Sequence, residues 1–230
     1  MDHIEVRAEV LEGHARLRAL LDGLTERSVR EPSALPGWSR AHVLSHIEGV
    51  GRAFARQVRY ALKGELVEVY DGGRPARDAA IEAGAPRTAD ALRTAVAGAL
   101  AVTEDAWTAV GAEDWARPVR HRDSDVAAVL RAWWRELEIH TADLRLGRGP
   151  GDWPRAFCVH VLDFLAPRAP EGVRLTLEAT DGPERRESGT GAPLTVRGRL
   201  GDLTAWLAGR EVPGPLDSGP APLPELAPWP

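Results

Sequence analysis

The sequence predicts a mainly α protein in two parts, an N-terminal antiparallel four-helix bundle followed by a small α+β unit. In four long stretches joined by short connections, apolar residues recur with the 3.6-residue period of a helix. Beyond a glycine-rich segment at 147–151, the pattern changes to the two-residue alternation of strands. We therefore expect residues 1–150 to form the bundle and residues 151–230 to form a second, smaller domain.

Four helices are expected at residues 2–25, 39–63, 88–110 and 123–147, with a shorter helical piece at 77–82. Ser39 is a favourable N-cap for the second of them. The fourth has the clearest pattern, because its apolar positions and His140 alternate steps of four and three, as in a coiled-coil seam. The first helix is expected to end before a loop at 28–32. His14, a lone histidine on this charged helix, is expected to be solvated.

The second domain is expected to begin with one more helix and to continue with strands. The predicted elements are a helix at 152–166, strands at 173–179, 184–188 and 194–198, and a closing helix at 200–208. The proline-rich segment from 212 to 230 is expected to be extended, with residues 223–226 held against the surface.

The composition excludes several classes of partner. Of the 230 residues, 43% are hydrophobic and 27% are charged, and acidic residues outnumber basic ones by 34 to 29. With no run of basic residues, binding to nucleic acid is not expected. No apolar run reaches the roughly 18 residues of a membrane span, and the first residues lack a signal sequence. We expect a cytoplasmic protein, either a monomer or a weak homodimer, in which the lone Cys158 forms no internal disulfide.

One stretch of the fourth helix carries residues with possible chemistry. Glu136 and His140 are four residues apart, so both side chains lie on one face of the helix. His46 lies at the edge of the apolar face of the second helix, whereas His42 lies further towards solvent. Zinc in catalytic sites is commonly held by three histidine or carboxylate ligands, which these helices could supply. An internal hydrogen bond between Glu136 and His140, or one from His140 to a backbone carbonyl, also explains the spacing, and Glu138 points away.

Several stretches of the chain, in the right order, resemble the mycothiol-dependent maleylpyruvate isomerase family, part of the wider DinB-like metalloprotein superfamily. The similar stretches are Leu35-Pro36-Gly37-Trp38-Ser39-Arg40-Ala41-His42-Val43-Leu44-Ser45-His46-Ile47, residues 77–84, Arg135-Glu136-Leu137-Glu138-Ile139-His140-Thr141-Ala142-Asp143-Leu144, residues 206–210 and residues 223–226. The resemblance therefore covers nearly the whole chain. One departure is visible at Thr141, where the family often has a second histidine.

The resemblance implies a DinB-like four-helix bundle and a sterol-carrier-protein-like α/β domain. It also implies a divalent metal ion, usually zinc (Zn2+), held by His46, Glu136 and His140. The second domain of the family contributes an arginine to the cleft, and its best match is Arg210. The low-molecular-weight thiol mycothiol is the implied cofactor. Cys158 lies among apolar residues and is expected to serve packing.

The implied activity is a zinc- and mycothiol-dependent cis–trans isomerisation of maleylpyruvate or a related maleyl-type acid. A zinc-bound thiol is largely ionised near neutral pH, and its reversible addition to the double bond would allow rotation. Arg210 is expected to pair with a carboxylate of the substrate or with a developing enolate. Two alternatives stay open: a mycothiol-dependent S-transferase that detoxifies electrophiles, and a non-catalytic zinc-binding module.

Overall fold

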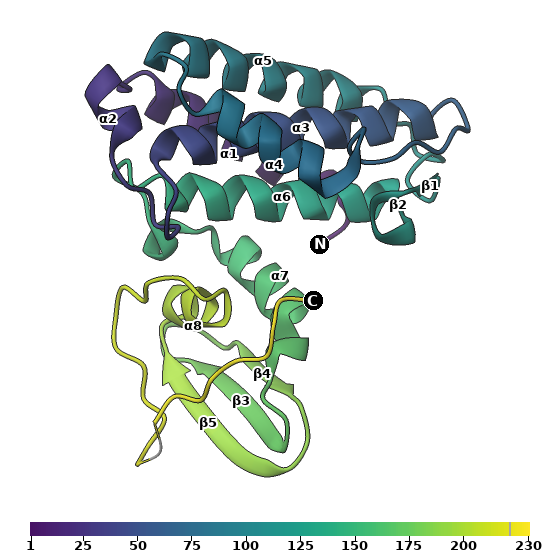
Figure 1. Ribbon diagram of the computed structural model, residues 1–230. Coiled ribbons are helices and arrows are strands. Elements are labelled where there is room, and N and C mark those ends of the chain that lie inside the picture. The colour runs from purple at the N-terminus through teal and green to yellow at the C-terminus, as the bar shows by residue number, and fades with distance from the viewer. Residues whose placement is uncertain (221) are drawn as a thin grey trace. The chain divides into compact units, whose positions relative to one another are not determined.

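The computed structural model describes residues 1–220 and 222–230, which form two compact units, Met1–Leu146 and Gly147–Pro230. The first unit is helical apart from a pairing of two very short strands, and the second combines helices with a small sheet (Figure 1). The expectation of a mainly helical protein with a smaller sheet-containing part is confirmed.

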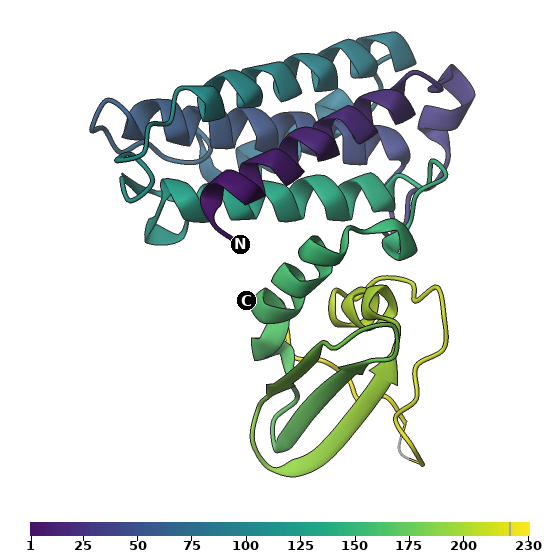
Figure 2. The ribbon, with the colours of Figure 1, turned by 180° about the vertical axis from the view of Figure 1, so that it is seen from behind.

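Four long helices make up most of the first unit. They are α1 (His3–Leu21), α3 (Arg40–Ala61), α5 (Ala89–Thr108) and α6 (Val126–Asp143), and a shorter helix α4 (Gly73–Gly84) packs on α3. Both α1 and α3 contact α5 and α6. The view from behind shows α1 along the face that is hidden in the first view (Figure 2). The helix predicted at 77–82 is thus longer than expected at both ends.

Two short elements of the first unit were not predicted. The helix α2 (Glu26–Arg30) occupies part of the stretch that was expected to be a loop. Thr25 starts it through a capping box, in which the side chains and backbone N–H groups of Thr25 and Ser28 bond reciprocally. The strands β1 (Pro118–Val119) and β2 (Ser124–Asp125) pair antiparallel just before α6, around the 3₁₀ turn η1 (His121–Asp123).

The core between the long helices contains a histidine that was expected to be solvated. His14 has an exposed fraction of 0%. Its Nε2 accepts a hydrogen bond from Trp133 Nε1 at 2.8 Å, and its Nδ1 lies 2.9 Å from Glu104 Oε1. The expectation for His14 was wrong because both ring nitrogens find partners inside the protein, which removes the cost of burying a polar ring.

Close helix contacts in this core depend on small residues. A Cβ atom added to Gly51 on α3 would lie 3.1 Å from the Trp133 ring on α6. At Gly13 on α1, an added Cβ would lie 2.6 Å from Leu137 Cδ2. Because Gly13 and Gly51 have no side chain, Leu137 and Trp133 of α6 pack directly on the backbones of α1 and α3.

The second unit follows the predicted order of elements. Its elements are η2 (Pro150–Asp152), α7 (Arg155–Leu165), η3 (Ala166–Arg168), β3 (Val173–Ala179), β4 (Arg185–Ser188), β5 (Ala192–Gly198) and α8 (Leu200–Leu207). The sheet order is β4-β3-β5, with β4 antiparallel and β5 parallel to β3. Helix α8 packs on both α7 and the sheet. Arg168 fixes the C-terminal segment, because its Nε donates to Ala227 O at 2.7 Å.

In the described part of the chain, every helix is too short or too polar to pass through a lipid bilayer.

Candidate metal centre

Two helices of the first unit bring three possible metal ligands together. His46 comes from α3, and Glu136 and His140 come from α6, one helical turn apart. Asp125 sets the start of α6, because its side chain accepts the N–H of Ala128 at 2.7 Å. With the start of α6 fixed and its apolar stripe packed on α1 and α3, the face that carries Glu136 and His140 is turned towards α3.

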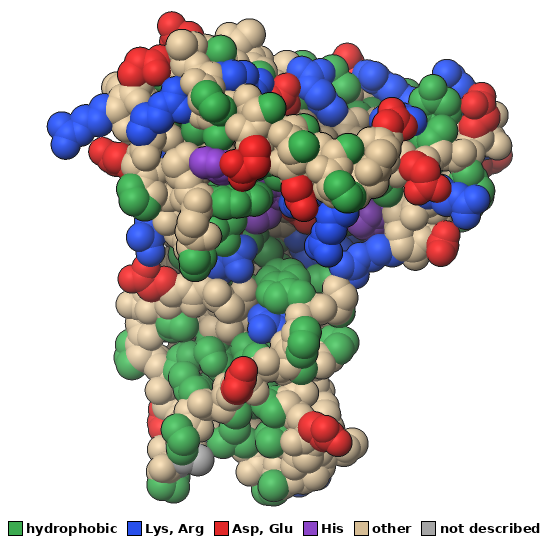
Figure 3. Space-filling model, viewed as in Figure 1, with side chains coloured by type: hydrophobic (Ala, Val, Ile, Leu, Met, Phe, Trp, Pro, Cys, Tyr) green, Lys and Arg blue, Asp and Glu red, His purple; other side chains and the backbone are tan. Residues whose placement is uncertain are grey.

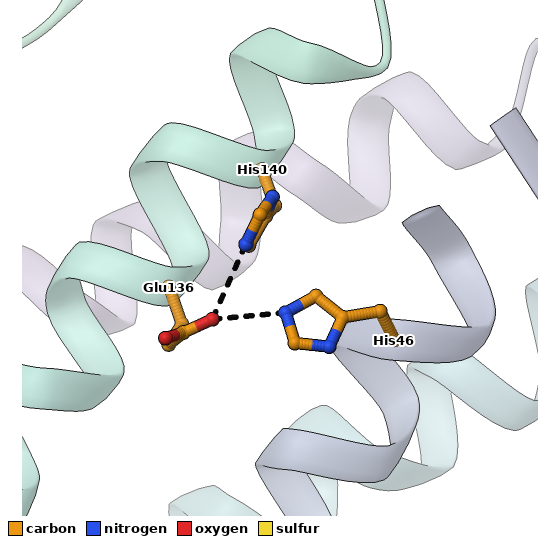
Figure 4. A group of neighbouring side chains, drawn as sticks. All are labelled: His46, Glu136 and His140. Atoms are coloured by element: carbon orange, nitrogen blue, oxygen red, sulfur yellow. Dashed lines mark hydrogen bonds and ion pairs between the residues drawn. The ribbon is translucent and has the colours of Figure 1, made fainter. Parts of the chain in front are cut away.

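The three side chains meet at one carboxylate oxygen (Figure 4). Glu136 Oε2 lies 2.9 Å from His46 Nε2 and 3.2 Å from His140 Nε2. The two imidazole rings stand edge to face, with centroids 4.5 Å apart. One possible ligand atom from each residue lies within 4.8 Å of the other two. Both Nε2 atoms therefore converge on the same small volume.

Hydrogen bonds in the cluster control its protonation. Burial alone would lower the pKa of His140, but its bonds to Asp143 and Glu136 outweigh burial and raise the pKa to about 9. Burial alone would raise the pKa of Glu136, but hydrogen bonds from His140 and His46 hold it well below its usual range. Burial lowers the pKa of His46, against the hydrogen bond to Glu136. The cluster therefore holds an ionised carboxylate and a protonated His140 at neutral pH.

The donor set fits a zinc ion. Two imidazole nitrogens and one carboxylate oxygen are a common catalytic zinc set, with bond lengths of roughly 2.0–2.2 Å and a fourth position left for another ligand. Asp143, whose side chain is 1% exposed, lies 2.9 Å from Nδ1 of His140. This bond keeps a hydrogen on Nδ1, so that once His140 loses its second proton to a metal ion, the lone pair of Nε2 faces the cluster. A carboxylate behind a histidine ligand is a recurrent feature of zinc sites.

Arg77 on α4 adds a condition for metal binding. Its Nη2 lies 3.2 Å from Nδ1 of His46, and its Nη1 lies 2.6 Å from Asp78 Oδ1. While Arg77 donates to Nδ1, the ring hydrogen of neutral His46 is on Nε2 and points at Glu136. A metal ion on Nε2 would require the hydrogen on Nδ1, which would end the hydrogen bond from Arg77.

A pocket opens beside the cluster within the first unit. Its volume is about 260 Å³, and it is lined by His46, Val50, Phe54, Val69, Tyr70, Arg74, Arg77, His121 and Glu136. Burial raises the pKa of Tyr70 and lowers the pKa of His121. Figure 3 shows basic side chains in blue next to histidine side chains in purple on the α4 side of this unit. A small molecule in the pocket would therefore contact both the cluster and cationic groups.

His42 and Glu138, which were not expected to bind the metal, have other partners. His42 Nδ1 contacts Ser39, with the hydroxyl at 2.7 Å and the backbone N at 3.2 Å. Glu138 is buried and pairs with Arg16 on α1. The ligand atoms that converge are thus those of His46, Glu136 and His140, whereas His42 and Glu138 face other partners. Thr141 is also buried, and its hydroxyl has no hydrogen-bond partner in the described part of the chain.

Two residues named from the sequence belong to the second unit. Arg210 follows α8, and its Nη1 donates to the carbonyl of Ala208 at 3.1 Å. Its role in a cleft stays a prediction. Cys158 lies on α7 with an exposed fraction of 1%, and its Sγ is 3.9 Å from the carbonyl oxygen of Trp153. This burial agrees with a packing role for the thiol.

Sequence reasoning missed Asp143 and the arginines of α4. Asp143 could have been found, because a carboxylate three residues after a histidine lies on the same helix face. Arg74 had no comparable signal, and Arg77 was marked only as part of a stretch that resembles the family, since the approach of both to the cluster depends on the loop between α3 and α4. Spacing within one helix predicts neighbours on that helix, but not the approach of a separate segment.

The fold and the cluster together define a class of protein: a helical unit with a site of two histidines and one carboxylate, joined to a smaller unit built on a three-stranded sheet. Family models identify the class further. Residues 10–145 match the mycothiol maleylpyruvate isomerase N-terminal domain, and residues 152–228 match the C-terminal domain of the same proteins. The chain belongs to this enzyme family, which confirms the family assigned from the sequence.

Solved structures show the same fold. A crystal structure of the mycothiol-dependent maleylpyruvate isomerase and one of its histidine-to-alanine mutant each superpose with a TM-score of 0.88. Both are 24% identical in sequence, and the match covers 100% of this chain and 98% of each of theirs. A search among curated proteins found no match.

Proposed function

We propose that this protein is a zinc- and mycothiol-dependent cis–trans isomerase of maleylpyruvate or a related maleyl-type acid. One observation carries the proposal beyond family membership. Two histidine Nε2 atoms and one carboxylate oxygen converge beside a pocket of about 260 Å³. A buried structural ion pair has no need of an adjoining pocket, whereas a catalytic metal needs access for substrate.

The residues of the chain have distinct tasks in this proposal. His46, Glu136 and His140 hold the metal, and Asp143 orients His140 through Nδ1. Bound zinc and mycothiol together would supply an ionised thiol as the nucleophile for reversible addition to the cis double bond. Arg210 pairs with a carboxylate of the substrate or with the developing enolate. The described part of the chain contains a single thiol, that of buried Cys158, so the nucleophile comes from the cofactor.

The architecture of the family supports a corresponding division of the chain. We assign residues 1–150 to a DinB-like, metal-binding four-helix bundle and residues 151–230 to a sterol-carrier-protein-like α/β domain. The packing of α1, α3, α5 and α6 on one another supports the first assignment. The helices packed on a three-stranded sheet support the second.

The proposal is tested by incubating purified protein with zinc, mycothiol and maleylpyruvate while the cis–trans change is followed spectroscopically. We expect turnover that requires both zinc and the thiol. A parallel reaction with an alkylating electrophile in place of maleylpyruvate separates isomerisation from S-transfer. If the protein turns over the electrophile but not maleylpyruvate, it is an S-transferase and the isomerase proposal is wrong.

Calorimetry separates both enzymes from a non-catalytic zinc module. An enzyme of either kind should bind mycothiol only when zinc is present, because zinc held by His46, Glu136 and His140 would bind the thiol as a thiolate. If zinc-loaded protein fails to bind mycothiol at millimolar concentration, the catalytic proposals are both wrong.

A further inference from the structure

The pocket beside the cluster is small. Its volume is about 260 Å³, whereas pockets for drug-sized ligands have roughly 300–1,000 Å³. A short-chain acid is smaller than ligands of that class and fits this space. The size of the pocket therefore favours the acid substrate as its occupant.

The charged groups that line the pocket differ in their pairing. Glu136 is engaged by His46 and His140, and Arg77 contacts both His46 and Asp78. Arg74 lines the same pocket, yet its guanidinium makes no hydrogen bond or ion pair within residues 1–220 and 222–230. An unpaired guanidinium at a pocket presents a planar fork of donors that matches a carboxylate.

The position of Arg74 on its helix adds to this positive field. Arg74 is the second residue of α4, and the first turn of α4 contains no acidic residue. The positive end of the helix dipole is therefore uncompensated by a side chain of its own helix. A negatively charged ligand near Arg74 would be stabilised by both charges.

A second donor reaches the pocket from another element. His121 lies in η1, where its ring packs edge-on to Phe54 with centroids 4.8 Å apart. In the part of the chain that the structure describes, neither ring nitrogen of His121 has a hydrogen-bond partner. Arg74 and His121 thus bring two unsatisfied polar groups from separate segments to one cavity.

We propose that Arg74, assisted by His121, binds a carboxylate of the acid substrate in the pocket beside the metal cluster. This inference rests on the proposed function for the identity of the acid, and it assigns a role to two residues outside the metal site. The side chain of Arg74 would set the position of the double bond relative to the metal, without taking part in bond changes.

The test measures the binding of maleate, a small cis-diacid, to zinc-loaded protein by calorimetry in the absence of mycothiol. Arg74→Gln should weaken binding by about ten- to hundredfold, the effect of losing a charge-assisted hydrogen bond. Arg74→Lys should recover part of it, because the charge remains while the fork is lost. His121→Gln should have a smaller effect, of about threefold to tenfold.

Arg27→Gln is the matched control, because Arg27 is a 93% exposed arginine of the same unit and does not line the pocket. Its binding of maleate should be unchanged. Zinc stoichiometry and mycothiol affinity should remain those of the unmodified protein in all four variants. If Arg74→Gln binds maleate as well as the unmodified protein, or loses zinc and mycothiol together with maleate, the inference is wrong.

The outcomes separate this inference from the proposed function. If maleate binding depends on Arg74 but the protein isomerises no maleylpyruvate, the role of Arg74 in binding a carboxylate stands and the proposed isomerase activity is wrong. If the protein isomerises maleylpyruvate and Arg74→Gln leaves KM unchanged, the proposed function stands and the role of Arg74 is wrong. With both correct, Arg74→Gln raises KM for maleylpyruvate about ten- to hundredfold and changes kcat by much less.

Discussion

Two buried histidine networks contact helix α6, and they differ in what their ring nitrogens face. On the α1 side, His14 accepts from Trp133 through Nε2 and lies 2.9 Å from Glu104 through Nδ1. On the α3 side, His46 and His140 both direct Nε2 at Glu136. Burial and a carboxylate partner are therefore common to both networks. The candidate metal ligands differ from His14 in that two Nε2 atoms face the same carboxylate oxygen, that of Glu136, beside a pocket.

The difference in environment also appears in protonation. Burial lowers the pKa of His14 to about 4, despite its hydrogen bond to Glu104. The side chain of His140 is 15% exposed, and its bonds to two carboxylates raise its pKa to about 9. The first network thus holds a neutral ring that serves packing, and the second holds a positive charge that a metal ion could replace.

The largest expected effect separates the two networks by metal binding. His46→Ala removes a ligand and should lower zinc affinity by more than about a hundredfold. Removing a residue that only hydrogen-bonds to a ligand lowers affinity by about ten- to hundredfold. Zinc-dependent turnover should disappear with it. Metal analysis of the purified variant and the isomerisation assay measure both effects.

His14→Ala and His42→Ala are the controls for that experiment, since neither residue belongs to the cluster. Both should keep stoichiometric zinc. A His46→Ala protein that retains stoichiometric zinc would show that the cluster is not the metal site.

The next effect concerns stability in acid. The unfolded chain binds a proton at His14 near pH 6.5, whereas the folded protein resists protonation until about pH 4. Stability from neutral His14 is therefore complete above pH 6.5 and falls as the pH drops towards 4, by about 3 kcal/mol. Urea unfolding of metal-free protein across this range should show the loss.

His14→Gln removes this titration and should unfold with a shallower pH dependence over the same range. The difference between the two proteins isolates His14 from the carboxylates that also titrate in acid. Parallel curves for the two proteins would mean that His14 is not held neutral in the fold.

The smallest expected effect tests the support behind the ligands. Asp143→Asn weakens the hold on His140 Nδ1 and should reduce zinc affinity by about ten- to hundredfold. Competition with a chelator measures the change. Glu138→Gln is the matched control, because Glu138 lies on the same helix and pairs with Arg16. Equal losses in the two variants would indicate general damage to α6.

Periodicity predicted the long helices and the strands because each has enough residues to show a repeat. The five residues of α2 and the two-residue strands are too short to do so. His14 did have a signal, since it lies four residues after Val10 and three before Leu17, both buried. Its charged neighbours hid the pattern.

The three possible ligands were predictable because two lie on one helix and the third lies near the apolar face of another. Asp143 had a readable spacing from His140, whereas Arg74 and His121 depend on the path of loops. In segments without a repeat, tertiary packing determines where the side chains lie, and a local sequence pattern carries no information about that packing. The pocket was therefore less predictable than the cluster.

The separation of the ligands along the chain links the site to folding. His46 lies 90 residues from Glu136, so the unfolded chain retains only the pair on α6. A metal ion that binds all three ligands then favours the folded state by mass action, by about 2.7 kcal/mol at a concentration a hundred times the dissociation constant. The docking of α3 on α6 would thus become sensitive to the supply of zinc, and metal depletion would reduce the amount of folded protein as well as its activity.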